Sequence, residues 1–96
     1  MPALSYYTNV HNTALVILQQ KGFRVWTCSE PDCVCAEKDG WDLWAEDPVQ
    51  LLGLAAIHDF HCPSDFREYW WRLNDPWLMD NLPSQPPDYT PVWKRD

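Results

Sequence analysis

Four cysteines and two neighbouring histidines are the residues of this chain best suited to chemistry. Cys28, Cys33 and Cys35 follow the spacing C-x4-C-x-C, and Cys62 comes directly after His61. Thiolate and imidazole groups are zinc ligands, but structural zinc sites usually take ligand pairs from tight C-x2-C turns. On paired strands the observed spacing would aim neighbouring thiols poorly at a tetrahedral centre. We therefore expect no cofactor and interpret the cysteines as small apolar residues of a half-buried sheet.

A zinc-stabilised adaptor, with Cys28, Cys33 and Cys35 joined by His61 or Cys62 as ligands, is the alternative. A disulfide between Cys28 and Cys33 is also geometrically conceivable. The N-terminus has no basic segment before its apolar run, and that run is amphipathic, so we expect neither a secretory signal nor a transmembrane span, which favours the cytoplasm. In that compartment we expect mainly reduced thiols.

His58, His61 and Cys62 form a second group, which resembles a Cys/His nucleophile pair in composition. Such a pair also needs an orienting group and an oxyanion site, and the sequence identifies neither. Histidines near a helix end are instead stabilised by the helix dipole. We expect no catalytic residues and no enzymatic activity. A small enzyme remains a further alternative, and it would require a deep polar pocket around these three residues.

The predicted helix over residues 47–60 has the clearest boundary signals in the chain. Asp47 is a strong N-cap residue, Pro48 is harmless in a first turn, and Gln50 completes a capping box. Apolar residues cover most of the helical wheel, with Leu52 near the centre of the apolar arc. We therefore expect a helix that is buried on nearly all sides.

The remaining segments predict a helix, three strands and further helical structure. Residues 9–21 have helical apolar spacing and end at Gly22, beyond which Phe23 can fold back on Leu18 in a Schellman cap. Strands are expected over residues 23–28, 33–38 and 41–46, with a turn at 29–32 and a type I′ hairpin turn at Asp39-Gly40. Residues 64–73 carry a helical apolar stripe, Asp75-Pro76 ends it, and one more turn follows over 77–82.

This order predicts an α+β fold in two layers. It has an N-terminal helix, a three-stranded antiparallel meander, two C-terminal helices and a proline-rich extended tail. We expect one domain over residues 1–82 and a tail over 83–96 that packs on or near it.

The hairpin turn also predicts the strand register and two separate sheet faces. Arg24 should oppose Glu37, as a cross-strand ion pair, and Trp26 should oppose Cys35. The face toward the helices should hold Phe23, Val25, Val34, Ala36, Trp41, Leu43 and Ala45. The other face should hold Arg24, Trp26, Cys28, Cys33, Cys35, Glu37, Asp42, Trp44 and Glu46.

Acidic charge dominates the middle of the chain. The net charge is -7, and residues 25–66 contain nine acidic residues and the single base Lys38. A negative field repels phosphate groups and anionic lipids, so direct binding to nucleic acid or membrane is disfavoured. A protein partner with a basic surface is favoured. Monomer and homodimer are both compatible with the sequence.

The expected binding residues are Trp26, Glu37, Asp42, Trp44 and Glu46. Aromatic side chains surrounded by charge are typical of protein interfaces, although the tail could also cover the two tryptophans. The sequence therefore favours a small acidic inhibitor, either an immunity protein or antitoxin, or a phage-type inhibitor of a nucleic-acid-handling enzyme such as an anti-CRISPR protein.

Overall fold

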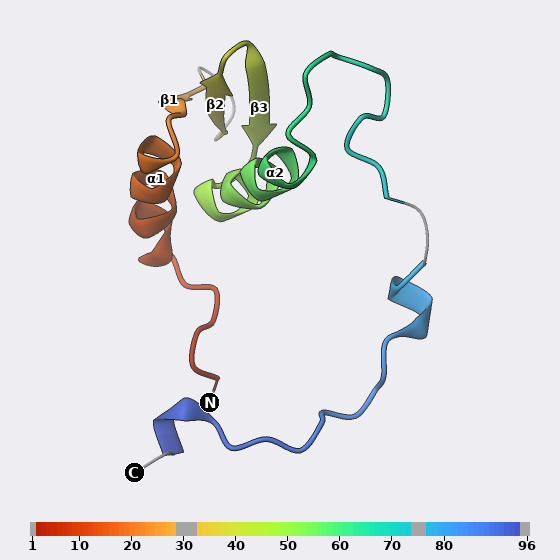
Figure 1. Cartoon of the computed structure of the whole chain (residues 1–96). Helices are drawn as coiled ribbons and strands as arrows, with labels where there is room; N and C mark the ends of the chain where they lie inside the picture. Colours follow the sequence, from red (N-terminus) through yellow and green to blue (C-terminus); the bar gives the residue numbers. More distant parts are fainter. Residues whose placement is uncertain (1, 29–32, 74–76, 95–96) are drawn as a thin grey trace. The chain divides into compact units, whose positions relative to one another are not determined.

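The computed structural model contains two α-helices and one three-stranded antiparallel sheet, and it describes residues 2–28, 33–73 and 77–94. The turn expected at 29–32 and the helix stop expected at Asp75-Pro76 lie outside these residues. The elements are α1 (Val10–Gln20), β1 (Arg24–Thr27), β2 (Val34–Lys38), β3 (Trp41–Ala45), α2 (Pro48–His61) and the short 3-10 helices η1 (Met79–Asn81) and η2 (Val92–Lys94). Figure 1 shows their order along the chain. The α+β class and the three-stranded meander are confirmed.

The chain divides into two compact units. Residues 7–71 carry both α-helices and the sheet, and residues 1–6 with 72–96 form the other unit. None of the described residues of the second unit is buried, and outside η1 and η2 these described residues belong to neither a helix nor a strand. The domain boundary expected at residue 82 remains a prediction. None of the helices in the described part of the chain has the length and apolarity needed to cross a bilayer.

Helix α1 ends in the predicted Schellman motif. Gly22 adopts a left-handed conformation with φ of 96°, which glycine reaches without the strain that a Cβ atom would cause. The Phe23 amide donates to the Leu18 carbonyl at 3.0 Å, and the Gly22 amide donates to the Gln19 carbonyl at 3.0 Å. Phe23 and Leu18 are both buried in one apolar cluster. The chain thereby leaves the helix in the direction of β1.

The register of the sheet agrees with the sequence-based prediction. Trp26 pairs with Cys35, and Cys35 pairs with Trp44 on its other side. The hairpin between β2 and β3 turns at Asp39 and Gly40, both with positive φ, as a type I′ turn requires. The predicted ion pair is also present, with Arg24 Nε 2.7 Å from Glu37 Oε1.

The core lies between the sheet and the two helices, which contact each other and the sheet. Its buried residues are Leu18, Phe23, Ala36, Leu43, Ala45, Leu51 and Ala55. Leu51 and Ala55 are fully buried, whereas Leu52 is only partly buried at the edge of the cluster. The expectation that Leu52 marks the centre of the buried arc is therefore wrong. Phe60 and Ile57 are exposed, so α2 is buried on one side rather than on nearly all sides.

Helix α2 begins where the sequence predicts. Asp47 Oδ1 accepts a hydrogen bond from the Gln50 amide at 2.9 Å, and Pro48 occupies the first turn. The Gln50 side chain reaches back to the amide of Glu46 at 3.2 Å, one residue before the cap. In a standard capping box it would bond to the cap residue itself. Two amides near the helix start are nevertheless paired.

We expect Asp47→Ala to lower the free energy of unfolding by about 1 kcal/mol, because the Gln50 amide loses its acceptor. Chemical denaturation monitored by circular dichroism would measure this change. Asp47→Asn, which keeps a capping oxygen, is the matched control and should retain most of the stability. An unchanged midpoint for the alanine variant would contradict the assigned cap.

The helix expected over residues 64–73 is not present. This segment consists of bends and turns, and its Trp70 amide donates to the Arg67 carbonyl at 3.1 Å in a single turn. Tyr69 adopts a left-handed conformation with φ of 58°, which an α-helix cannot contain. The apolar stripe instead reflects ring contacts, since Trp70 packs on Trp41 with ring centroids 5.0 Å apart and Phe66 lies 6.4 Å from the same ring. The turn expected over 77–82 is represented by η1.

Candidate functional site

The sheet face opposite the core carries the residues that the sequence assigned to partner binding. We call this set the outer face: Arg24, Trp26, Cys28, Cys33, Cys35, Glu37, Asp42, Trp44 and Glu46. Alternation along the strands places the paired members of this set on the sheet face opposite Ala36, Leu43 and Ala45, which point toward the helices. Cys33 is nevertheless buried, and Glu46 directly follows the last paired residue of β3. The strand register places Trp26, Cys35 and Trp44 in one row and Arg24, Glu37 and Asp42 in the next.

Both tryptophans of the outer face are exposed. Trp26 exposes 48% and Trp44 exposes 57% of its surface. Cys35 lies between them in the register and is half-buried. The two indoles are large apolar groups on the two edge strands of the sheet. Trp26 belongs to β1 and Trp44 to β3, and each of these strands pairs with β2. Such side chains offer much contact area for little loss of side-chain entropy on binding.

The carboxylates of the outer face differ in how firmly they are held. Glu37 accepts hydrogen bonds from the Gly40 amide at 2.8 Å and from the Arg24 guanidinium. These bonds hold the pKa of Glu37 below its usual value. The hydrogen bond from the Gly40 amide has the largest effect, and the hydrogen bond from Arg24 has the next largest. Asp42 and Glu46 are exposed at the β3 end of the face. The register therefore places Trp26 and Trp44 in one row and Glu37 and Asp42 in the next, with Glu37 paired to Arg24, while Glu46 lies just beyond the end of β3.

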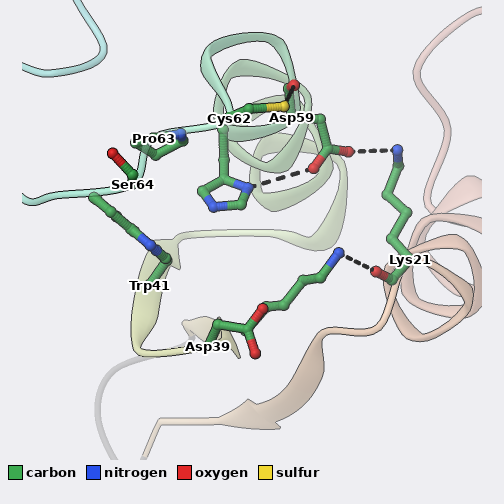
Figure 2. Close-up of a pocket in the computed structure, with 9 residues that line it drawn as sticks. Lys21, Asp39, Trp41, Asp59, Cys62, Pro63 and Ser64 are labelled. Atoms are coloured by element: carbon green, nitrogen blue, oxygen red, sulfur yellow. Dashed lines mark hydrogen bonds and ion pairs between the residues drawn. The ribbon is translucent and has the colours of Figure 1, made fainter.

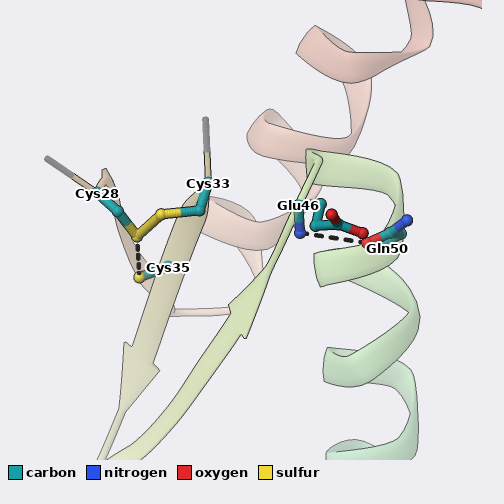
Figure 3. The surroundings of a disulfide bond; sticks show 5 residues. All are labelled: Cys28, Cys33, Cys35, Glu46 and Gln50. Carbon is teal, nitrogen blue, oxygen red and sulfur yellow. Dashed lines mark hydrogen bonds between the residues drawn. A yellow bond between two sulfur atoms is a disulfide. The ribbon is translucent and has the colours of Figure 1, made fainter. Parts of the chain in front are cut away.

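Three cysteines gather at one end of the outer face. Cys28 and Cys33 are joined by a disulfide, with Cα atoms 5.3 Å apart, and Cys35 Sγ lies 2.9 Å from Cys28 Sγ (Figure 3). The expectation of reduced thiols is therefore wrong for Cys28 and Cys33. The reason is the register, because the Cys28 amide donates to the Cys33 carbonyl and the two residues directly oppose each other.

Cys62 is separate from this sulfur cluster. It ends α2 in a left-handed conformation, and its thiol donates to the Asp59 carbonyl at 3.0 Å. Within the described ranges, no group of three or more histidine, cysteine or acidic side chains is arranged to hold a metal ion. The alternative ligand set that adds Cys62 to the three strand cysteines is thus not assembled.

We expect purified protein to contain well under one equivalent of zinc and its melting temperature to be unaffected by a chelator. A structural zinc ion would contribute directly to folding, so its removal would lower the melting temperature strongly. Elemental analysis, with and without reductant during purification, would measure the metal content. One equivalent of zinc in the reduced protein, lost in a Cys35→Ser variant, would contradict this expectation.

A polar pocket lies at the C-terminal end of α2, with a volume of about 650 Å³. Its lining residues are Lys21, Lys38, Asp39, Trp41, His58, Asp59, Cys62, Pro63 and Ser64 (Figure 2). Lys21 Nζ lies 2.6 Å from Asp59 Oδ2, and Lys38 Nζ donates to the Lys21 carbonyl at 2.8 Å. These bonds tie the end of α1 to α2 and to β2.

In the described part of the chain, the His58 ring and the Cys62 thiol both line the polar pocket, and each contacts a group other than the other. His58 Nδ1 is 3.4 Å from Asp59 Oδ1, and its ring packs edge-on against Phe23. The Cys62 thiol donates to a backbone carbonyl, and His61 is not among the lining residues. His61 Nε2 instead donates to the Trp71 carbonyl at 2.9 Å. The absence of enzymatic activity remains a prediction.

The Lys21–Asp59 pair gives the stability a predictable dependence on pH. The Lys21 hydrogen bond is the main cause that holds the pKa of Asp59 below its usual value. A depressed carboxyl pKa stabilises the fold above the unfolded-state value of about 4, and this contribution disappears as the pH falls through the lower folded-state pKa. We therefore expect Asp59→Asn to flatten the acid limb of a stability profile measured by denaturation between about pH 2 and pH 6. An unchanged acid limb would contradict this assignment.

A second pocket, which we call the tryptophan pocket, opens beside β3. It has a volume of about 490 Å³. Its lining residues are Asp42, Leu43, Trp44, Leu54, Ile57, Trp70 and Trp71. It adjoins the outer face through Asp42 and Trp44, which belong to both. Sequence reasoning missed it because residues 47–60, which include Leu54 and Ile57, were expected to be buried on nearly all sides, and residues 64–73, which include Trp70, were expected to be helical.

Comparison with models of known protein families, with curated proteins and with solved structures finds no match for this chain. We therefore describe the protein by its own fold and surfaces. It is a small α+β protein with two helices on one face of a three-stranded sheet and an exposed acidic and aromatic face on the other.

Proposed function

We propose that this protein is a binding module that inhibits a protein with a basic surface. The observation that carries this proposal is the outer face, where Trp26 and Trp44 are exposed on either side of Cys35. Exposed aromatic side chains supply buried area on binding, and surrounding carboxylates supply steering and selectivity. Asp42 and Glu46 provide that charge beside Trp44.

The net charge of -7 indicates which partner is favoured. A negative protein is attracted to basic surfaces and repelled by nucleic acid itself. Enzymes that act on nucleic acid present such basic surfaces to bind phosphate groups. We therefore propose a nucleic-acid-handling enzyme as the target, with carboxylates occupying the positions of phosphates. An immunity protein or antitoxin and a phage-type inhibitor, such as an anti-CRISPR protein, are two forms of this function.

Comparative affinity capture would test the proposal. The bait proteins are the wild type, an outer-face variant with Asp42→Lys and Glu46→Lys, and a control with Asp65→Lys and Glu68→Lys. The control makes the same change of charge at exposed residues after α2 that are not on the sheet. Glu37 is left unchanged because it pairs with Arg24 and with the hairpin turn.

The expected result is a basic protein that the wild type and the control retain and the outer-face variant loses. Purified partner should then be inhibited in its nucleic-acid reaction by stoichiometric wild-type protein and not by the outer-face variant. A partner retained equally by all three baits would show that another surface is used. A retained partner whose activity is unchanged would overturn inhibition but not binding.

A further inference from the structure

The tryptophan pocket combines aromatic walls with a single negative charge. Trp44, Trp70 and Trp71 supply three indole groups, and Leu54 and Ile57 supply aliphatic surface. Asp42 is the one charged residue among those that line it, and it is exposed. We propose that this pocket binds an arginine side chain of the protein partner. This inference rests on the proposed function, because it names the group through which the partner is anchored.

The chemistry of the lining selects among side chains. A purely apolar side chain would cover Asp42 without pairing its carboxylate, which is unfavourable. An acidic side chain would be repelled by the same carboxylate. An arginine side chain has an apolar stem for Leu54 and Ile57, and its planar guanidinium stacks on indoles and bonds to a carboxylate through two N–H groups. Lysine offers a point charge without that planar fork, so arginine fits better.

The walls of the tryptophan pocket are held by contacts outside it. The Trp70 ring packs on Trp41, with centroids 5.0 Å apart, and lies 6.1 Å from the His58 ring. The Trp71 backbone carbonyl accepts a hydrogen bond from His61 Nε2 at the end of α2. Tyr69 takes a left-handed conformation at the turn that precedes both tryptophans. The Tyr69 ring also packs edge-on against Trp71, with centroids 6.1 Å apart.

The pocket also lies where a partner on the outer face would reach it. Asp42 and Trp44 alternate along the edge strand β3 with buried Leu43 between them. An arginine that projects from the partner beside β3 could therefore enter while the rest of the partner contacts Trp26 and Glu46. Charge complementarity, from the pocket and from the net charge of the chain, favours a cationic group over any other.

Titration with small arginine compounds tests, without the partner, whether the tryptophan pocket binds an arginine side chain. The probes are N-acetyl-arginine-N-methylamide and its citrulline, lysine and norleucine counterparts, with the tryptophan indole N–H signals observed by NMR. Binding of the arginine probe should shift the Trp44 and Trp71 signals with a dissociation constant of about 1–10 mM. Citrulline, which has the same shape without the charge, should bind at least about five-fold more weakly.

Variants assign the effect to the pocket. Asp42→Asn should weaken arginine binding about three- to ten-fold and leave citrulline binding unchanged. Trp44→Phe should also weaken arginine binding, whereas Trp26→Phe, a matched change at an exposed tryptophan outside the pocket, should not. Amide spectra of each variant verify that the fold is retained. The proposal would be overturned if the norleucine probe or the lysine probe bound with the same affinity as the arginine probe. It would also be overturned if the arginine probe caused no saturable shift of the Trp44 signal.

The identified partner separates failure of this inference from failure of the proposed function. If Glu46→Lys and Trp26→Ala weaken the partner complex but Trp71→Ala does not, the outer face binds the partner and the arginine pocket is wrong. If the arginine probe binds the pocket but none of the three substitutions changes the affinity of the partner complex, the proposed function is wrong and the pocket binds another ligand. Loss of binding in all three variants, together with arginine selectivity, supports both.

Discussion

Leu51→Ala is expected to lower the free energy of unfolding by about 3 to 5 kcal/mol. Leu51 is fully buried on α2, within the cluster that also contains Leu18 from α1 and Ala36 from β2. The substitution removes three carbon atoms and leaves a cavity where helix and sheet meet. Packing around that cavity can relax only in part, so the lost contacts are not recovered. Urea denaturation followed by circular dichroism would measure the change.

Two substitutions on the same helix provide controls. Ile57 exposes 41% of its surface, so Ile57→Ala should cost clearly less than Leu51→Ala. Leu52 packs at the edge of the core cluster, so Leu52→Ala should give an intermediate value. A loss below about 1 kcal/mol at Leu51, or an equal loss at Leu51 and Ile57, would contradict the observed orientation of α2.

Trp44→Ala is expected to raise the dissociation rate of the partner complex by about 30-fold or more, as removal of a central aromatic anchor does. Trp44 exposes 57% of its surface in the free chain, so its loss should change the stability of the fold little. Surface plasmon resonance with the captured partner would measure the rates, and thermal denaturation would measure stability. A stability loss of about 3 kcal/mol or more would instead show that Trp44 is covered within the folded chain.

Charge on the outer face should act on the association rate constant of the partner complex, whereas Trp44 acts on its dissociation rate constant. Asp42→Lys with Glu46→Lys should slow association, and the wild-type association rate should fall steeply with added salt, because long-range attraction is screened. The control pair Asp65→Lys and Glu68→Lys should have a smaller effect. If neither added salt nor the outer-face substitutions change the association rate, the complex is formed by another surface.

Local signals in the sequence were sufficient for the helix boundaries and the sheet. The ends of α1 and α2 depend on Gly22 and Asp47, each of which acts on backbone groups within five residues. The hairpin register depends on Asp39-Gly40, since a two-residue turn allows one pairing of the flanking strands. Once that register is set, alternation along the strands assigns Trp26, Trp44 and Glu37 to one face and Ala36 and Leu43 to the other.

Features that depend on distant segments were not accessible in this way. Lys21 and Asp59 are 38 residues apart, and they pair because α1 and α2 pack against each other. The sequence pointed to Leu52 rather than Leu51 as the centre of the buried arc, since apolar residues on both sides of the wheel leave its orientation open. Only contact with the sheet and α1 selects one rotation of that helix.

The segment after α2 shows the same limit most clearly. Its aromatic residues recur at helical spacing, yet Trp70 and Phe66 pack on Trp41, which belongs to the hairpin 29 and 25 residues earlier, respectively. Tyr69 takes a left-handed conformation that the local sequence disfavours. An isolated short helix is marginally stable in water, so ring contacts with Trp41 can determine the conformation of this segment, and Trp70 and Trp71 form walls of the tryptophan pocket there. A pattern of spacing contains no information about which distant ring is available for contact, so only the tertiary structure decides it.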